Sequence, residues 1–426
     1  MIKIYSKNSH LKFIELSFII LPLALISGPF LPDFIIVTSS IIFIHYCFKY
    51  YNFHLFKNKF FYLFLIYYFY ISINSVFNNP NFDSIKISFS FVRFGVYTVA
   101  IIYLITCNEK ILKNFFYVLF FCITILIFDG FFQYYFSYNI FGKPLVEAHR
   151  VSSFFGDELI LGSYISRFFP ILFGLFILLK NEIKINNSLI IIVFILAEVL
   201  VFLSGERTSF LFINLAAIYS LIMLKQFRKI RAISLISSIF ILVLISFASN
   251  NVKSRIINHT LDQTRILNSG KLKVALNDND QGIYIFSKQH THHYITSIRM
   301  FVENKYFGVG VKNFRNFCNK HDYSVSNLSC STHPHNTYLQ ILSELGLIGF
   351  LFILSFFLTF CYYSFIHILS KFKKTQFFSS FQICMLSGIL IILWPIAPSG
   401  NFFNNWLIII SMIPVILFIW AIKLNK

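Results

Sequence analysis

The chain has 426 residues, of which 57% are hydrophobic and 12% charged, and its mean hydropathy is +0.71. Soluble domains average about 45–50% apolar and 25% charged residues, so this composition indicates a membrane protein. It excludes a secreted, disordered or nucleic-acid-binding chain. The formal net charge of +19 does not indicate a nucleic-acid partner, because the basic residues form short clusters between apolar blocks.

Apolar blocks recur from one end of the chain to the other. A helix needs about 17–25 apolar residues to cross the hydrocarbon core of a bilayer. The sequence therefore predicts an all-α polytopic membrane protein with about twelve transmembrane helices. In chain order these segments are 13–30, 34–49, 60–76, 88–107, 114–136, 161–179, 188–203, 208–224, 232–248, 337–366, 377–394 and 406–422.

Lysine and arginine residues concentrate at the N-terminus and in every second connection between these segments. Examples are Lys57 and Lys59, Lys110 and Lys113, and the stretch from Lys225 to Arg231. Cytoplasmic connections of membrane proteins carry such an excess of positive charge, so we expect both termini in the cytoplasm. An even number of segments agrees with this orientation.

One connection, residues 250–336, differs from the others in length and charge. Helices of a bundle are usually joined by about 2–8 residues, whereas this connection is many times longer and carries eleven Lys and Arg residues. Long loops are translocated regardless of charge. We therefore predict a large periplasmic loop with short helices, whose basic character suits an anionic ligand. Segments one to nine then occupy 1–249, and the last three occupy 337–426.

Three features of this loop can be interpreted from its sequence. An amphipathic pattern predicts a helix over 290–306 that ends near Gly308. The His-Thr-His-His stretch at 290–293 lacks companion cysteines or carboxylates at metal-ligand spacing, so we expect no metal site. Cys318 and Cys330 lie on the predicted oxidising side, and both a disulfide and two free thiols remain open.

The turn from Leu203 to Ser209 joins two apolar segments on the predicted outer side and contains Arg207. A guanidinium keeps its proton and can bind a phosphate through two hydrogen bonds. Thr208 and Ser209 suit a helix start, where free backbone N–H groups favour an anion. We favour anion binding over the alternative, in which Arg207 reaches the interface or pairs with Glu206.

A second charged stretch leads into the sixth segment and contains Arg150, Asp157, Glu158 and Arg167. Two interpretations remain open. It is either part of a substrate site or a set of mutually paired charges at the membrane interface. In the first case Asp157 and Glu158 would orient the arginines.

A third polar group, from His333 to Tyr338, stands where the loop re-enters the membrane. Pro334 favours a helix start, so His335 would lie at the outer mouth of the tenth segment. Counting 100° per residue places Gly346 and Gly349 on the same helix face as His335. An imidazole titrates near neutrality and can act as a general base, although a structural histidine is the alternative.

These residues resemble the signatures of the O-antigen ligase and polymerase superfamily. His335-Asn336, followed after nine residues by Gly346 and after two more by Gly349, is similar to the family's re-entry motif. Arg207 with Leu211 four positions later resembles its short arginine motif. The segments 150–169 and 304–310 are also similar to that family, and the resemblance runs from about residue 140 to 360.

The resemblance implies a type-C-like membrane glycosyltransferase of the bacterial inner membrane that needs no metal or cofactor and whose site faces the periplasm. Such enzymes move a glycan from undecaprenyl pyrophosphate to an acceptor hydroxyl. His335 matches the essential histidine and Arg207 a pyrophosphate-binding arginine, whereas Arg150 and Arg299 are looser matches. We expect an inverting reaction, with supporting roles for Asn336, Tyr338, Glu206 and Asp157.

The two branches of this family differ in their acceptor. A ligase transfers to the lipid A core, and a polymerase transfers to the next lipid-linked repeat unit. The His-Asn-Gly-Gly spacing favours the ligase, with the polymerase as the alternative. A transporter or flippase of lipid-linked sugars is less favoured, because such proteins show internal repeats and charged groups at the membrane midplane.

Overall fold

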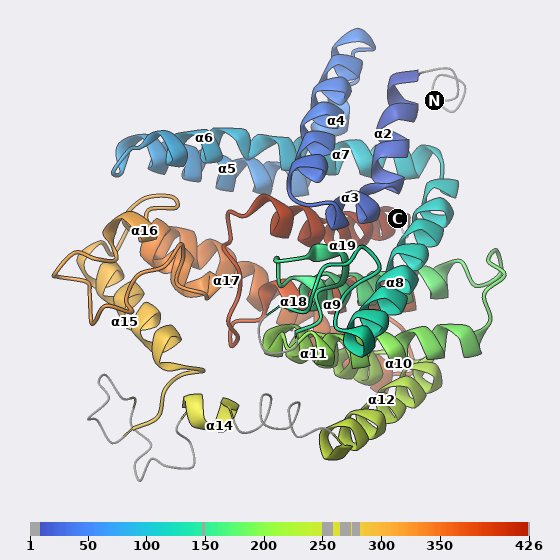
Figure 1. Ribbon diagram of the computed structural model, residues 1–426. Coiled ribbons are helices and arrows are strands. Elements are labelled where there is room, and N and C mark those ends of the chain that lie inside the picture. Colours follow the sequence, from blue (N-terminus) through green and yellow to red (C-terminus); the bar gives the residue numbers. More distant parts are fainter. Residues whose placement is uncertain (1–8, 147–149, 249–258, 265–273, 275–281, 425–426) are drawn as a thin grey trace.

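The computed structural model describes residues 9–146, 150–248, 259–264, 274 and 282–424 (Figure 1). Within these ranges the regular structure is helical, with only isolated β-bridges besides. The prediction of an all-helical, polytopic membrane protein is confirmed in these general terms. Five of the eleven basic residues of the long loop lie outside the described residues: Lys253, Arg255, Arg265, Lys271 and Lys273.

The helices have the following bounds. The first half of the chain forms α2 (Ser9–Ile19), α3 (Leu21–Ile26), α4 (Phe30–Lys49), η1 (Phe53–Phe56), α5 (Lys59–Phe77), α6 (Phe82–Ser90), α7 (Val92–Cys107), α8 (Lys110–Phe136), η2 (Ser153–Phe155), α9 (Leu161–Leu178) and α10 (Asn187–Leu203). The second half forms α11 (Arg207–Met223), α12 (Arg228–Ala248), α14 (His259–Thr264), α15 (Lys288–Glu303), α16 (Phe314–Phe317), α17 (Thr337–Phe372), α18 (Ser380–Leu393) and α19 (Asn405–Leu424).

Seven helices within the described residues are long and apolar enough to cross a membrane: Phe30–Lys49, Lys59–Phe77, Phe82–Cys107, Lys110–Phe136, Leu161–Leu178, Thr337–Phe372 and Asn405–Lys423. Helices α10, α11 and α18 are apolar but shorter. Each of the twelve predicted segments falls on helical structure. The first is divided between α2 and α3, where Pro22 stands at the start of α3 and removes a backbone donor. A count of twelve membrane spans stays a prediction.

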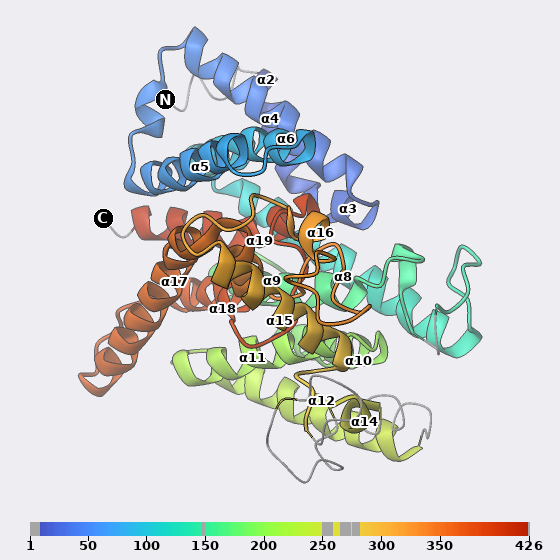
Figure 2. The same cartoon turned by 90° about the vertical axis from the view of Figure 1, so that its left-hand side faces the viewer.

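Helices α9 and α18 form the centre of the bundle, whereas α4 and α12 lie at its periphery (Figures 1 and 2). Nearly all residues of α9 are buried, although it contains Pro170. Gly174 permits the close approach of α18, because a Cβ there would lie 2.6 Å from the side chain of Met385. Small residues serve this purpose in membrane bundles, where apolar burial does not drive helices together.

The entrance to α17 differs from the straight helix that the sequence predicted. His335 precedes the helix and has a left-handed backbone with a φ of 57°. Asn336 is the N-cap, and its side chain accepts hydrogen bonds from the backbone of Tyr338 and Leu339. Gly346 then interrupts the helix with a φ of 65° and a ψ of −164°. The predicted common face of His335, Gly346 and Gly349 is therefore wrong, because the helical count does not continue across this kink.

The kink in α17 is held by backbone hydrogen bonds to the long loop. The amide of Leu347 donates to Lys305 O at 2.8 Å, and the amide of Val309 donates to Ser343 O at 2.8 Å. Gly346 suits this position because glycine tolerates a positive φ and a Cβ would lie 2.3 Å from the backbone of Tyr306. Segment 305–310 and α17 therefore form one backbone unit.

Within the loop, α15 packs against α17 in both views (Figures 1 and 2). It begins two residues before the predicted helix and ends at Glu303, with Asn304 as its C-cap. Gly308 does not cap it but lies against the backbone of Glu344. The open question about the two loop cysteines has an answer in this structure, because Cys318 and Cys330 form a disulfide with a Cα–Cα distance of 5.1 Å.

Candidate active site

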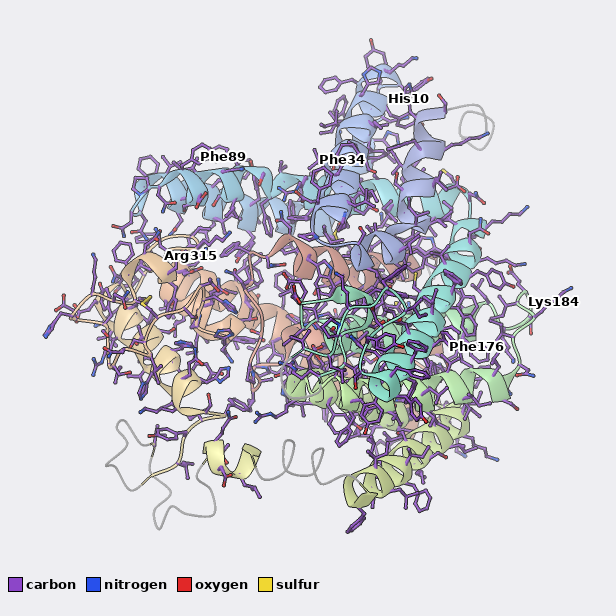
Figure 3. The ribbon with its side chains drawn as sticks, viewed as in Figure 1. His10, Phe34, Phe89, Phe176, Lys184 and Arg315 are labelled. Carbon is purple, nitrogen blue, oxygen red and sulfur yellow. A yellow bond between two sulfur atoms is a disulfide. The ribbon has the colours of Figure 1, made fainter. Side chains whose placement is uncertain are left out.

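A cavity of about 1010 Å³ opens where several helix ends meet. It is lined by the end of α3, the segment that leads into α9, the α10–α11 turn, parts of the long loop and the α18–α19 connection. The charge pattern assigns these connections, and the end of the first predicted segment that α3 forms, to one side of the membrane. In Figure 3, Arg315 of the long loop and Lys184 of an opposite connection lie at opposite sides of the molecule.

Cationic side chains outnumber carboxylates in the cavity lining. Lys143, Arg150, Arg167 and Arg207 line it, against Glu158 and Glu206. Arg207 is the first residue of α11 and is exposed at this surface. Arg150 is partly buried, and its Nε donates to Ser204 O at 3.1 Å. The structure thus brings two of the three predicted arginines into one cavity, where their charge favours an anionic group.

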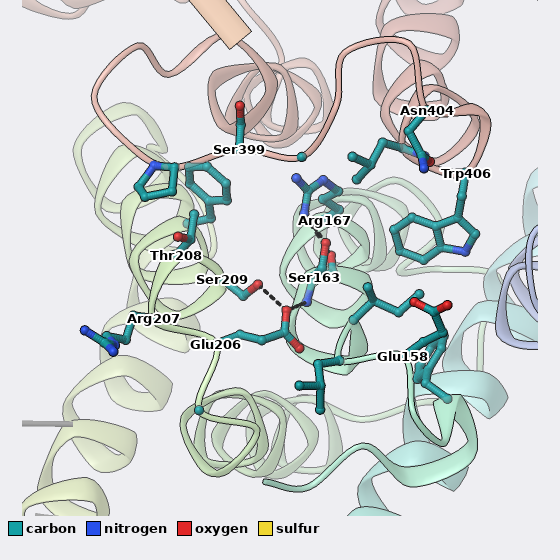
Figure 4. A pocket seen from close by; sticks show the side chains of 18 of the residues that line it. Glu158, Ser163, Arg167, Glu206, Arg207, Thr208, Ser209, Ser399, Asn404 and Trp406 are labelled. Atoms are coloured by element: carbon teal, nitrogen blue, oxygen red, sulfur yellow. Dashed lines mark hydrogen bonds between the residues drawn. The ribbon is translucent and has the colours of Figure 1, made fainter. Parts of the chain in front are cut away.

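Glu206 connects two helix ends across the cavity wall (Figure 4). Its carboxylate accepts hydrogen bonds from Gly162 N at 2.6 Å, from Ser163 N at 2.9 Å and from the Ser209 hydroxyl at 2.8 Å. Burial raises its pKa, and these hydrogen bonds act in the opposite direction. A negative charge at the free N–H groups of α9 is favourable, so Glu206 supports the wall that carries the arginines.

Arg167 also lines the cavity, and no separate role was predicted for it from the sequence. It lies one turn after Ser163 in α9, and its Nη1 donates to the Ser163 hydroxyl at 2.5 Å. Its Nε is buried without a hydrogen-bond partner among the described residues. In Figure 4 the guanidinium extends from Ser163 towards Ser399. The available signal was the i, i+4 spacing of a serine and an arginine at the start of an apolar helix.

His335 lies in a cluster of four imidazoles. Its ring centroid is 4.1 Å from that of His333, 5.3 Å from that of His293 and 5.4 Å from that of His290. The ring is partly buried, lines the cavity and has no hydrogen-bond partner within the described part of the chain. Burial lowers the pKa of His335, so the imidazole is neutral at pH 7 and can accept a proton.

The backbone around His335 is fixed by one residue of the α18–α19 connection. Ser399 N donates to His335 O at 2.8 Å, and Ser399 O accepts from His333 Nε2 at 3.2 Å. The Nδ1 atom of His333 lies 2.9 Å from the Thr332 hydroxyl. Both ring nitrogens of His333 therefore have hydrogen-bond partners. Burial and the neighbouring His335 lower the pKa of His333 to about 3.

Four predicted residues lie outside the cavity lining. Asn336, besides capping α17, donates from Nδ2 to Pro395 O at 2.9 Å, and the hydroxyl of Tyr338 donates to Leu393 O at 2.6 Å. These two residues hold the connection that carries Ser399. Arg299 is exposed and donates to Ser324 O at 2.8 Å, and Asp157 is also exposed. The structure does not bring Arg299 or Asp157 to His335.

Among the described residues, no group of three or more His, Cys, Asp and Glu side chains has an arrangement that could hold a metal ion. This includes the cluster of four imidazoles that contains His335, whose ring pairs are T-shaped, stacked or tilted. Metal ligation would require their nitrogens to converge on one point at about 2.0–2.1 Å.

Apolar helices of membrane-spanning length, with a cavity at their ends that is lined by cationic and apolar side chains, together define a polytopic membrane protein. Residues 191–354 match the family model described as O-antigen ligase. This match confirms the resemblance to the O-antigen ligase and polymerase superfamily, and it includes both Arg207 and His335. The family implies a membrane glycosyltransferase-type enzyme that acts on lipid-linked glycans. A comparison with curated protein sequences gives no match.

Proposed function

We propose that the protein is an O-antigen ligase-type glycosyltransferase of the bacterial inner membrane. It moves a polysaccharide from undecaprenyl pyrophosphate to a hydroxyl of the lipid A core on the periplasmic side. The observation that carries this proposal is the shared cavity, in which the imidazole of His335 and the guanidinium groups of Arg150 and Arg207 line the same space.

The arginines would bind the diphosphate of the donor. A glycosyl pyrophosphate already has a good leaving group, so the main requirement is positive charge where the departing phosphates gain charge. Arg207 and Arg150 can supply this charge through hydrogen bonds without losing their protons. Arg167, whose Nε has no partner among the described residues, adds a third guanidinium to the same cavity.

His335 would act as the general base. The acceptor hydroxyl transfers its proton to a free ring nitrogen of His335, and the hydroxyl oxygen forms a bond to the anomeric carbon. The bond between that carbon and the phosphate oxygen breaks, and its electron pair leaves with undecaprenyl pyrophosphate. Because the acceptor attacks from the face opposite the leaving group, the anomeric configuration inverts.

The remaining lining suits the lipid and limits access by water. Apolar side chains including Phe154, Leu211, Phe212 and Trp406 line the same cavity as the arginines. An apolar lining next to a cationic one fits a polyprenyl chain that ends in a diphosphate. Residues of α14 and of the segment before α15 also line it, and such a cover would exclude water, which competes as an acceptor.

The direct test uses the full-length protein reconstituted in liposomes. The substrates are the lipid-linked glycan and the lipid A core, both extracted from a strain that lacks the gene. We expect His335→Ala to abolish transfer while the protein level and membrane insertion stay unchanged. Retained transfer would contradict the assignment of His335 as the base. The glycans of the deletion strain separate the two branches. Long polymer on the carrier indicates a ligase, whereas a single repeat unit on the core indicates a polymerase.

A further inference from the structure

The histidines of segment 290–293 have no role in the transfer described above. They lie in the first turns of α15, which begins after the N-cap Ser287. His292 and His293 are buried, with 1% and 0% of their surface exposed. His290 is partly buried and lines the cavity together with His335.

The N-cap of α15 fixes the hydrogen-bonding state of His290. The hydroxyl of Ser287 accepts from His290 N at 3.2 Å and lies 2.7 Å from His290 Nδ1. Since that hydroxyl oxygen already accepts the capping bond, its own hydrogen is available to donate to Nδ1. This arrangement favours the tautomer with the proton on Nε2. His290 Nε2–H has no hydrogen-bond partner within the described ranges.

Comparison of the four imidazoles singles out His290. Both nitrogens of His333 are used by Thr332 and Ser399. His293 does not line the cavity, and its ring stacks on His335 with an angle of 21° between planes. Besides His335, His290 is therefore the imidazole that has both an unused nitrogen and a place in the cavity lining.

The geometry also indicates which substrate His290 would contact. In an inverting displacement the attacking oxygen and the leaving phosphate stand on opposite faces of the anomeric carbon. His335 must lie on the acceptor side, because it takes the acceptor's proton. The ring centroid of His290 is 5.4 Å from that of His335, with an angle of 75° between the ring planes, so a sugar whose hydroxyl lies at His335 comes within reach of His290.

We propose that His290 is an acceptor-binding residue, whose Nε2–H donates a hydrogen bond to a sugar oxygen beside the hydroxyl that His335 deprotonates. This assignment rests on the proposed transferase function. Burial and the neighbouring His335 and Arg207 lower the pKa of His290 to about 4. His290 therefore stays neutral when His335 takes up a proton, as two adjacent imidazoles do not readily carry charge together.

The test compares two substitutions of similar size and flexibility in the reconstituted full-length protein. His290→Gln keeps an N–H donor but cannot titrate, and His290→Met removes the donor. Initial rates are measured at saturating lipid-linked glycan with increasing lipid A core, both extracted from the deletion strain. We expect His290→Met to raise KM for the acceptor about five- to tenfold, the size of one lost neutral hydrogen bond. Its KM for the donor stays unchanged, and His290→Gln stays close to the unaltered protein.

The matched control is Gln289→Ala, which changes the exposed neighbour of His290 on the same helix and should leave both KM values unchanged. Two results would overturn the assignment while His335→Ala remains inactive. One is an unchanged acceptor KM in His290→Met. The other is equal impairment in His290→Gln and His290→Met, which would indicate a proton-transfer role. Absence of transfer by the unaltered protein would remove the proposed function, and the role of His290 with it.

Discussion

Two buried polar clusters of this protein differ in how their hydrogen bonds are used. Between α10 and α12, Arg231 forms an ion pair with Glu198, and both side chains are 1% exposed. Arg231 also donates to Ser234 at 2.9 Å, and Ser238 donates to Glu198. At the cavity, by contrast, the Nε of Arg167 is buried without a hydrogen-bond partner among the described residues, and the ring of His335, which lines the same cavity, makes no hydrogen bond to them.

The difference separates structural from functional polar groups. A buried charge is costly unless it is paired and hydrogen-bonded, so the pair of α10 and α12 is complete within the protein itself. The guanidinium of Arg231 also lies 4.4 Å from the ring centroid of Phe169. Polar groups that stay incomplete beside a cavity are available to a ligand. Substitutions at the cavity should therefore affect activity, and substitutions in the cluster between α10 and α12 should affect stability.

The largest effect is expected from loss of the base. His335→Ala should reduce the rate of transfer by about 10²–10⁴-fold, the usual contribution of a positioned general base. Thermal unfolding in detergent should change little, because the side chain makes no hydrogen bond within the described residues. The measurement is initial transfer rate together with melting temperature. A large loss of melting temperature would place His335 with the structural cluster instead.

The paired cluster should show the opposite behaviour. Arg231→Met alone leaves the carboxylate of Glu198 buried without its partner, and we expect a loss of about 3–5 kcal/mol in the free energy of unfolding. The double change Arg231→Met with Glu198→Leu should be less destabilising than the single one. Activity per folded molecule should stay unchanged in both. Equal destabilisation by the single and double variants would mean that the pair is not what holds α10 against α12.

An intermediate effect is expected at the arginine side of the cavity. Arg207→Lys keeps the positive charge but loses the bidentate hydrogen bonding of a guanidinium, so kcat/KM should fall about 10–100-fold. The comparison variant is Lys184→Arg, which lies in an opposite connection (Figure 3) and should be silent. Near-normal kinetics in Arg207→Lys would indicate that the Arg207 side chain extends to the membrane interface and does not bind phosphate.

The pH dependence of transfer provides a smaller test. The base must be neutral to accept a proton, and burial holds the pKa of His335 below its usual value of 6.5. Activity is therefore retained above that lowered pKa and is lost as the pH falls through it. We expect kcat/KM to reach half its plateau value below pH 6.5 and to fall by about tenfold per unit at still lower pH. A half-plateau value already reached near pH 7 would contradict a buried, neutral imidazole.

The smallest effect is expected at Arg299, which the resemblance to the family suggested as a phosphate ligand. Its side chain is exposed and donates to Ser324 O, away from the cavity lining. Arg299→Ala should therefore change kcat/KM by less than about twofold, since exposed substitutions away from special features cost little. A loss comparable with that of Arg207→Lys would show that the loop brings Arg299 to the substrate.

The sequence predicted those features that depend on local composition. Apolar blocks are long enough to identify helices such as α5, α8 and α17 within a few residues, because only helices satisfy their backbone groups in lipid. The pattern of basic residues predicted that the connections lining the cavity lie on the same side of the membrane. His335 and Arg207 were selected because polar groups near membrane helices are costly to keep without a function.

Features that depend on contacts between distant segments were not predictable in the same way. The kink at Gly346 requires segment 305–310 as its backbone partner, and Glu206 caps α9 from 44 positions away along the chain. Arg231 was interpreted as a cytoplasmic charge because it belongs to the basic stretch from Lys225 to Arg231. Its ion pair with Glu198 of α10 was not predicted. The i, i+3 spacing of His290 and His293 was visible, but its relation to His335 needed the packing of α15 on α17.

The position of Ser399 determines the stage of synthesis at which the candidate active site can form. Its backbone holds His335 and His333, and its hydroxyl lies 2.8 Å from that of Thr337. It lies between α18 and α19, near the end of the chain, and Trp406 of α19 also lines the cavity. The imidazoles therefore receive their final placement only after α18 and α19 have been inserted. A nascent chain on the ribosome, with its arginines already in the membrane, would not yet be able to consume the lipid-linked donor.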